Sequence, residues 1–345
     1  MVTVVDALNI YEVLSSLETL SEQNASGMVG NTGLAEGDAA AGGSVDNRSI
    51  AQLMLDQIEF ADVLLLSKVS MLLEKKPRSA VDEIIQLLRK LNPVAQVHAP
   101  EEPNFESLPL DAIVATGLFN MGKAQSSAGW LHELAKAERG GHTPETEEYN
   151  ISSFVYRTRE RPFHPKRLQE LLSSLGHYES CIVGLGKEGK EGEEGGGEGK
   201  EGLPAFAGVV RAKGQIWVAT SHSYPVEFQM AGRYIHLEPS RRPYLDAIPL
   251  DEWPQGAQMV RLRMMAERKW SKKYGDREVE AVFIGVRLQK AALVAELEKA
   301  LLTDEEMEGG PESWRAFEDV FFHGEYFDLK RPARHQKKGE SQGES

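Results

Sequence analysis

The chain has 345 residues, of which 41% are hydrophobic and 27% charged, a balance typical of a globular protein with roughly two domains. Its formal net charge of −14 argues against nucleic acid and against an anionic membrane surface as partners. A single cysteine, Cys181, excludes an internal disulfide and a Cys-x-x-Cys metal pair. One unpaired thiol favours a reducing compartment, and we expect a cytoplasmic protein.

The first part of the chain alternates strand-like and helix-like patterns. The predicted elements are a strand at 2–5, a helix at 49–60, a strand at 61–67, a helix at 79–93, a strand at 94–99 and a helix at 108–120. Ser49 is the expected N-cap of the first helix, and Ser79 with Asp82 indicates a capping box at the second. This order predicts an α/β domain with a doubly wound parallel sheet. A strand at the very start suggests that the sheet is incomplete.

The pattern changes near residue 140, after which a polar segment at 139–150 is typical of a linker. The elements predicted beyond it are strands at 151–159, 208–220, 226–238 and 279–288 and helices at 164–176 and 289–304. This order predicts a small α+β domain, in which helices back an antiparallel sheet.

Three segments have the composition of mobile chain. Residues 24–48 are rich in Gly, Ala, Asn and Asp, and we expect a loop there. Residues 186–202 consist only of Gly, Glu and Lys, which predicts a disordered insertion, with a charge-based binding segment as the alternative. Residues 329–345 are expected to form a flexible tail.

Several stretches, read together and in this order, resemble the CobW family of P-loop GTPases and metal chaperones, which includes the zinc-regulated GTPase metalloprotein activators. They are QIEFADVLLLSK (57–68), LNPVAQV (91–97), ATGLFNMGKA (115–124), GWLHEL (129–134), HTPETEEYNISSFVYRTRERPFHPKRL (142–168), VVRAKGQIWVAT (209–220) and YGDREVEAVFIG (274–285). The resemblance implies a partial GTPase domain at 1–140 and a CobW C-terminal domain at 141–328.

The resemblance also implies GTP, Mg²⁺ and zinc as cofactors, but the sequence contains neither the family's Gly-rich P-loop nor its Cys-x-Cys-Cys metal motif. We therefore expect the N-terminal portion of the GTPase domain to be absent. Ser67-Lys68-Val69-Ser70 stands where the family has Asn-Lys-Thr-Asp, and a serine cannot make the bidentate contact of the aspartate with guanine. Ser67, Lys68 and Ser70 are thus either a degenerate nucleotide-binding motif or simply the polar end of a strand.

A local basic cluster stands out in the second domain. Its members are Arg157, Arg159, Arg161, Lys166, Arg167, Arg211 and Lys213. A partner's acidic segment or a phosphate could dock on such a patch. The alternative is intramolecular pairing with Glu145, Glu147, Glu148 and Asp276.

The histidines show no pair at the spacing that places two metal ligands on one helix face. His164 precedes Pro165 at a predicted helix start, where it can cap and pack. No metal-site or catalytic residue is therefore assigned.

Two hypotheses follow. In the first, the chain is a homologue of the CobW-like GTPases that act as metal chaperones, and zinc is the expected metal. The chain by itself does not hydrolyse GTP. In the second, it is a catalytically inactive interaction module that acts through its CobW C-terminal domain. Under either hypothesis, the chain could bind a metal-dependent client protein or an intact GTPase partner.

Overall fold

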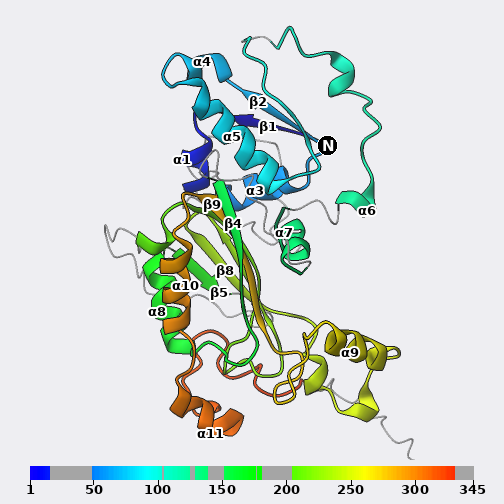
Figure 1. Cartoon of the computed structure of the whole chain (residues 1–345), viewed down its shortest axis with the longest axis vertical. Helices are drawn as coiled ribbons and strands as arrows, with labels where there is room; N and C mark the ends of the chain where they lie inside the picture. The colour runs from blue at the N-terminus through cyan, green and yellow to red at the C-terminus, as the bar shows by residue number, and fades with distance from the viewer. Residues whose placement is uncertain are drawn as a thin grey trace, which may run out of the picture.

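The structure is a computed structural model that describes residues 1–15, 49–102, 105–124, 129–138, 151–175, 177–180 and 204–330. A small parallel sheet lies at one end of the molecule and a larger, mostly antiparallel sheet at the other (Figure 1). The predicted loop at 24–48, linker at 139–150, insertion at 186–202 and tail beyond Lys330 lie outside these residues. None of the helices within the described ranges has both the length and the apolar character that crossing a lipid bilayer requires.

The first sheet is parallel, as the sequence predicts. Its strands, in the order β1-β2-β3, are β1 (Val2–Asp6), β2 (Val63–Ser67) and β3 (Gln96–His98). Its helices are α1 (Ile10–Ser15), α3 (Ile50–Glu59), α4 (Val69–Leu73) and α5 (Arg78–Leu91). Ser49 caps α3, because its hydroxyl accepts a hydrogen bond of 3.1 Å from the Gln52 amide. This confirms the predicted helix start.

Two predictions in this half are wrong. Helix α5 begins one residue before Ser79, with Pro77 at its N-cap position, so Ser79 lies inside the first turn and makes no cap. The helix predicted at 108–120 is only a short 3-10 turn, η1 (Leu110–Ala112). The chain then passes through left-handed backbone at Ala115 and Gly117, with φ of 54° and 63°, which an α-helix cannot accommodate. The helices that follow are α6 (Met121–Ala124) and α7 (Gly129–Glu138).

The second sheet has six strands in the order β4-β9-β6-β7-β8-β5. They are β4 (Ile151–Thr158), β5 (His177–Ser180), β6 (Val209–Ile216), β7 (Val226–Ala231), β8 (Tyr234–Pro239) and β9 (Val279–Val286). Its strands pair antiparallel, except that β5 runs parallel to β8. The segment 226–238 was predicted as one strand, but it turns back at Gly232, where φ is 55°, and forms a hairpin. The predicted α+β architecture is otherwise confirmed.

One face of this sheet is covered by two helices that lie side by side, α8 (Pro165–Leu175) and α10 (Lys290–Lys299) (Figure 1). Leu168 and Leu172 of α8 and Leu293 of α10 pack on the strands in an apolar cluster. The chain continues through α11 (Asp304–Trp314), whose Trp314 is fully buried at 5.9 Å, centroid to centroid, from the buried ring of Trp217. This aromatic cluster closes the lower end of the domain.

The opposite face of the large sheet joins the two halves. Apolar residues of α3 and α5 share one core cluster with Val210, Ala231, Val282 and Ile284 of the sheet. The register of β6 against β9 shifts between Val209 and Arg211, which marks a β-bulge. Because of the bulge, Val210 and Arg211 both face the N-terminal half, although they are neighbours in sequence.

A smaller lobe protrudes from the lower end of the large sheet (Figure 1). It contains η4 (Leu245–Ala247), η5 (Leu250–Glu252) and α9 (Ala257–Ala266). The carboxylate of Asp276 anchors it by accepting hydrogen bonds of 2.7 and 3.0 Å from the Leu245 and Asp246 amides. Arg277 adds an ion pair of 2.7 Å to Asp246. The lobe therefore has a rigid base.

Candidate functional site

The degenerate base motif lies at the carboxyl edge of the parallel sheet. Asp6 and Ser67 are register partners at the ends of β1 and β2, so residues that follow both strands meet there. Lys68 adopts left-handed backbone with φ of 58°, and its Nζ lies 2.6 Å from the Asp6 carboxylate. Burial alone would raise the pKa of Asp6, but hydrogen bonds from Lys68 and the Leu8 amide outweigh it and hold the pKa below its ordinary value. The charge of Lys68 is thus neutralised within the sheet edge.

The two serines of the motif have different surroundings. The Ser67 hydroxyl donates a hydrogen bond of 3.2 Å to the Val5 carbonyl, so it ties β2 to β1. Ser70 lies in the first turn of α4, at the position where the resemblance noted above implies an aspartate. A carboxylate carries a full negative charge and can accept hydrogen bonds from two N–H groups of one base edge. A serine hydroxyl is uncharged and cannot make this bidentate contact. Residue 70 thus presents a hydroxyl, and not a carboxylate, at this edge of the sheet.

The seven basic residues of the predicted patch occupy several separate places. Arg157 of β4 pairs with Glu280 of β9 at 2.5 Å, and Arg159 and Glu278, which flank these two strands, pair at 2.7 Å. Lys166 is exposed on α8. Lys213 lies on β6 beside Trp130.

Two more of these residues join the start of α8 to that of α11. Arg161 donates to Asp304 and, at 2.7 Å, to the Leu302 carbonyl. Arg167 makes two hydrogen bonds to Glu306, of 2.6 and 3.0 Å. The hydrogen bond from Arg167 lowers the pKa of Glu306 to about 2. These arginines therefore hold two helix starts together.

Arg211 is the most deeply buried member of the set, with no exposed side-chain surface. Its guanidinium donates to both oxygens of Glu59 on α3, at 2.8 and 3.1 Å. It also donates to Gln52 at 3.1 Å and to Asp56 at 3.3 Å, both on the same helix. Arg211 thus connects β6 of the second sheet to α3 of the first half.

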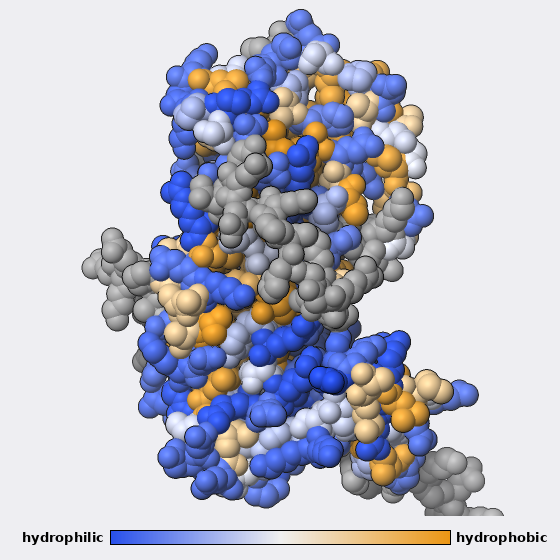
Figure 2. All heavy atoms as spheres, in the orientation of Figure 1, coloured by the Kyte–Doolittle hydropathy of each residue, from blue (hydrophilic) through white to orange (hydrophobic). Residues whose placement is uncertain are grey.

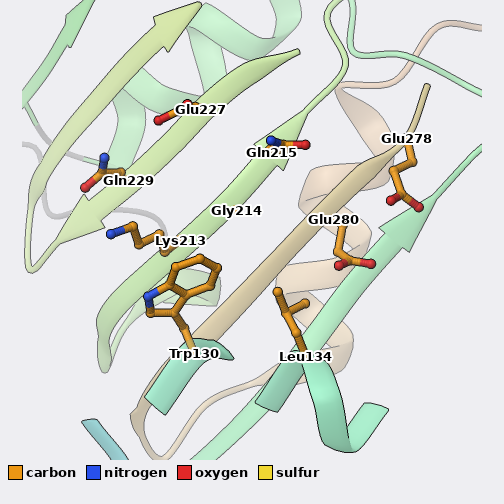
Figure 3. Close-up of a pocket in the computed structure, with 9 residues that line it drawn as sticks. All are labelled: Trp130, Leu134, Lys213, Gly214, Gln215, Glu227, Gln229, Glu278 and Glu280. Atoms are coloured by element: carbon orange, nitrogen blue, oxygen red, sulfur yellow. The ribbon is translucent and has the colours of Figure 1, made fainter. Parts of the chain in front are cut away.

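A cavity of about 460 Å³ opens between α7 and the polar face of the large sheet (Figure 3). It is lined by Trp130 and Leu134 of α7 and by Lys213, Gly214, Gln215, Glu227, Gln229, Glu278 and Glu280 of the strands or their flanks. The Lys213 Nζ lies 5.1 Å from the centroid of the Trp130 ring. The Trp130 Nε1 is buried and has no hydrogen-bond partner among the described residues. The cavity therefore offers one indole donor, one ammonium and several carboxylates and amides.

Burial changes the charge balance of this cavity. Desolvation, helped by the nearby Arg211, lowers the pKa of the Lys213 ammonium. Desolvation and the neighbouring Glu280 raise the pKa of the Glu278 carboxyl, against the opposing effect of Arg159. Both shifts have the same main cause, which is the burial of these side chains in the cavity wall. The i, i+2 spacing of polar residues on β6, β7 and β9 was the sequence signal for this face, and our sequence analysis did not use it.

No group of three or more His, Cys, Asp or Glu side chains that could hold a metal ion is present among the residues described. His164 caps α8, because its Nδ1 accepts from the Lys166 and Arg167 amides at 3.2 and 3.4 Å, and its ring lies 4.7 Å from that of Phe317. The capping and packing role predicted for it is confirmed. His142 and Cys181 lie outside the described residues.

Comparisons with known proteins identify the second domain. The profile of the cobalamin synthesis protein cobW C-terminal domain matches residues 151–301. The zinc-regulated GTPase metalloprotein activator 1 of Dictyostelium discoideum is 31% identical over 320 residues, which cover 92% of this chain and 55% of that protein. A zinc chaperone of Mycobacterium tuberculosis is 23% identical over 82% of this chain and 56% of its own length. The chain thus spans about half the length of these curated relatives.

Among solved structures, that of the Zn(II)-bound YjiA GTPase from E. coli aligns with 87% of this chain and 60% of its own. The sequence identity is 16% and the TM-score 0.30, too low to bear on function. The sequence comparisons, in contrast, run through both halves of the chain and include the domain profile. The chain contains a CobW C-terminal domain at residues 151–301, and it is homologous to a zinc-regulated GTPase metalloprotein activator.

Proposed function

We propose that this chain is a CobW-like metal-chaperone homologue, with zinc as its cargo, and that it does not hydrolyse GTP by itself. Its relatives are named as a zinc-regulated GTPase metalloprotein activator and a zinc chaperone, which supports the cargo. We further propose a partial GTPase domain at 1–140 and a CobW C-terminal domain at 141–328. A metal-dependent client protein or an intact GTPase is the proposed partner.

One observation carries the statement about GTP. At the carboxyl edge of β2, Lys68 is held by Asp6 at 2.6 Å, and residue 70 is a serine. Guanine recognition at this place needs a carboxylate that accepts two hydrogen bonds. Serine at position 70 therefore removes most of the discrimination between guanine and other bases, since an unmet bidentate contact costs roughly 1–3 kcal/mol or more.

The test uses the purified 345-residue chain and two readouts. Phosphate release from GTP should not exceed that of a heat-inactivated sample, and a fluorescent guanine nucleotide should bind no better than its adenine counterpart. The double variant S67N/S70D then asks whether restoring the motif restores guanine preference. Phosphate release by the wild-type chain above the control would overturn the proposal.

The cavity beside α7 supports a second candidate, an interaction module that works through the CobW C-terminal domain. Its lysine, its carboxyl groups and the Trp130 indole, which has no hydrogen-bond partner among the described residues, can bind backbone groups of a partner peptide. Titration of the chain with Zn²⁺ separates the two candidates. Stoichiometric zinc binding favours a chaperone that carries its cargo. Absence of zinc binding favours the interaction module.

A further inference from the structure

The protruding lobe at residues 241–273, called the α9 lobe below, exposes an unusual amount of apolar surface. Leu250 is 72% exposed, Met259 71%, Leu262 55% and Met265 50%, and Val260 is also exposed. In Figure 2 apolar side chains gather over this lobe, at the lower right. Contiguous apolar surface of this kind marks an interaction site more often than scattered single residues do.

Little of this apolar surface is covered by other residues that the structure describes. Of the ten residues of α9, only Ala257 is buried. At 100° per residue, Met259, Leu262 and Met265 lie on one side of the helix and Val260 on another, and none of the four is buried.

The helix is nevertheless firmly held. The Arg261 guanidinium lies 5.1 Å from the Trp270 ring and 5.9 Å from the Trp253 ring. The Trp253 indole donates a hydrogen bond of 2.9 Å to the Ile248 carbonyl. The exposed side chains therefore sit on a preformed support, which lowers the entropic cost of binding.

The α9 lobe is also basic, although the chain carries a net charge of −14. Residues 241–273 hold eight lysines and arginines against four acidic residues. The exposed basic side chains are those of Arg241, Arg242, Arg263, Arg268, Lys272 and Lys273. Arg263 reaches Glu267 only at 4.0 Å, an exposed pair of little strength. Exposed basic side chains therefore outnumber the exposed carboxylates of the lobe, which are those of Asp246, Asp251, Glu252 and Glu267.

We propose that the α9 lobe is a docking surface for an acidic, amphipathic segment of a partner protein. Apolar side chains of that segment would cover Met259, Leu262 and Met265, and its carboxylates would meet Arg263 and Arg268. Methionine is flexible and polarizable, so such a surface adapts to a protein partner. The proposal is independent of the cargo and nucleotide roles proposed above.

Other occupants fit the surface less well. A symmetric contact with a second copy would bring two basic surfaces together. A helix that lies on a bilayer separates an apolar from a basic face, whereas on α9 the exposed Arg263 projects between Met259 and Val260. The chain's own Gly/Glu/Lys segment at 186–202 is acidic but contains no apolar side chain to fill the surface.

The experiment measures binding of a labelled synthetic peptide by fluorescence anisotropy. The probe is an amphipathic helix with leucine and phenylalanine on one face and glutamate and aspartate on the other. A peptide with lysine in place of each acidic residue is its matched control. The full chain is compared with M259S/L262S/M265S and with R263E/R268E. The variant F119S/M121S removes equally exposed apolar side chains elsewhere, at 61% and 62% exposure.

The acidic peptide should bind the wild type and F119S/M121S equally, and the lysine peptide should not bind. Each α9 variant should weaken binding about tenfold or more, with an unchanged thermal midpoint. Absence of binding, or binding that both α9 variants retain, overturns the proposal. It is also overturned if the lobe instead binds phosphatidylserine vesicles, or if it drives concentration-dependent self-association in sedimentation.

Discussion

Replacing Arg211 by methionine tests the connection between the two halves of the molecule. The guanidinium is fully buried and makes four hydrogen bonds to α3, two of them to Glu59, which is itself 1% exposed. Methionine keeps much of the volume but leaves the Glu59 carboxylate without its guanidinium. Removal of one partner of a buried ion pair costs about 3–5 kcal/mol, so we expect R211M to lose that much free energy of unfolding.

Urea unfolding at neutral pH, followed by circular dichroism, gives the free energies for R211M, E59L and the double variant. Because the double variant leaves no buried unpaired charge, it should be more stable than R211M by about 2 kcal/mol or more. K299M is the control. It breaks the exposed Lys299–Glu296 pair, and it should change stability by no more than about 0.5 kcal/mol.

Two results would refute this reasoning. The first is a loss below about 1 kcal/mol in R211M, which would mean that water or another group replaces the guanidinium. The second is a double variant whose loss equals the sum of the two single losses, because uncoupled residues behave additively.

Two further predictions concern the second domain. The pKa of Glu306 is lowered from 4.5 to about 2, chiefly by the hydrogen bond from Arg167, so its stabilising effect is complete above the unfolded-state value and is lost as the pH falls through this range. The acid limb of a stability–pH profile should therefore be flatter in E306Q, and equal slopes would contradict the assignment. A Cβ on Gly214 would lie 2.1 Å from the Glu280 carbonyl oxygen, so G214A should lose about 1–3 kcal/mol in urea unfolding. The control is G122A, whose Cβ would meet only the tip of the Asn120 side chain, and it should keep the stability of the wild type. An equal loss of stability in G214A and G122A would argue against the backbone clash.

Part of the candidate site was visible in the sequence. A continuous apolar strand that ends in Ser67-Lys68-Val69-Ser70 places those residues at the carboxyl edge of a parallel sheet, and β2 has that position. The partner of Lys68 was not predictable, because Asp6 lies on a different strand and is brought there only by the register of β1 with β2. The cavity was missed because it forms where α7 crosses strands far away in sequence.

The sequence by itself determined the local elements that have strong periodicity or a clear cap, such as α3 with Ser49. It also carried the resemblance that pointed to a CobW C-terminal domain. Those features depend on neighbours within a few residues, which the order of side chains specifies. Only the tertiary structure decided how the basic residues are used and that α9 stays exposed. The burial of Arg211 depends on a β-bulge, and the exposure of α9 on the absence of any facing element among the described residues. Both depend on long-range packing, which local sequence does not encode.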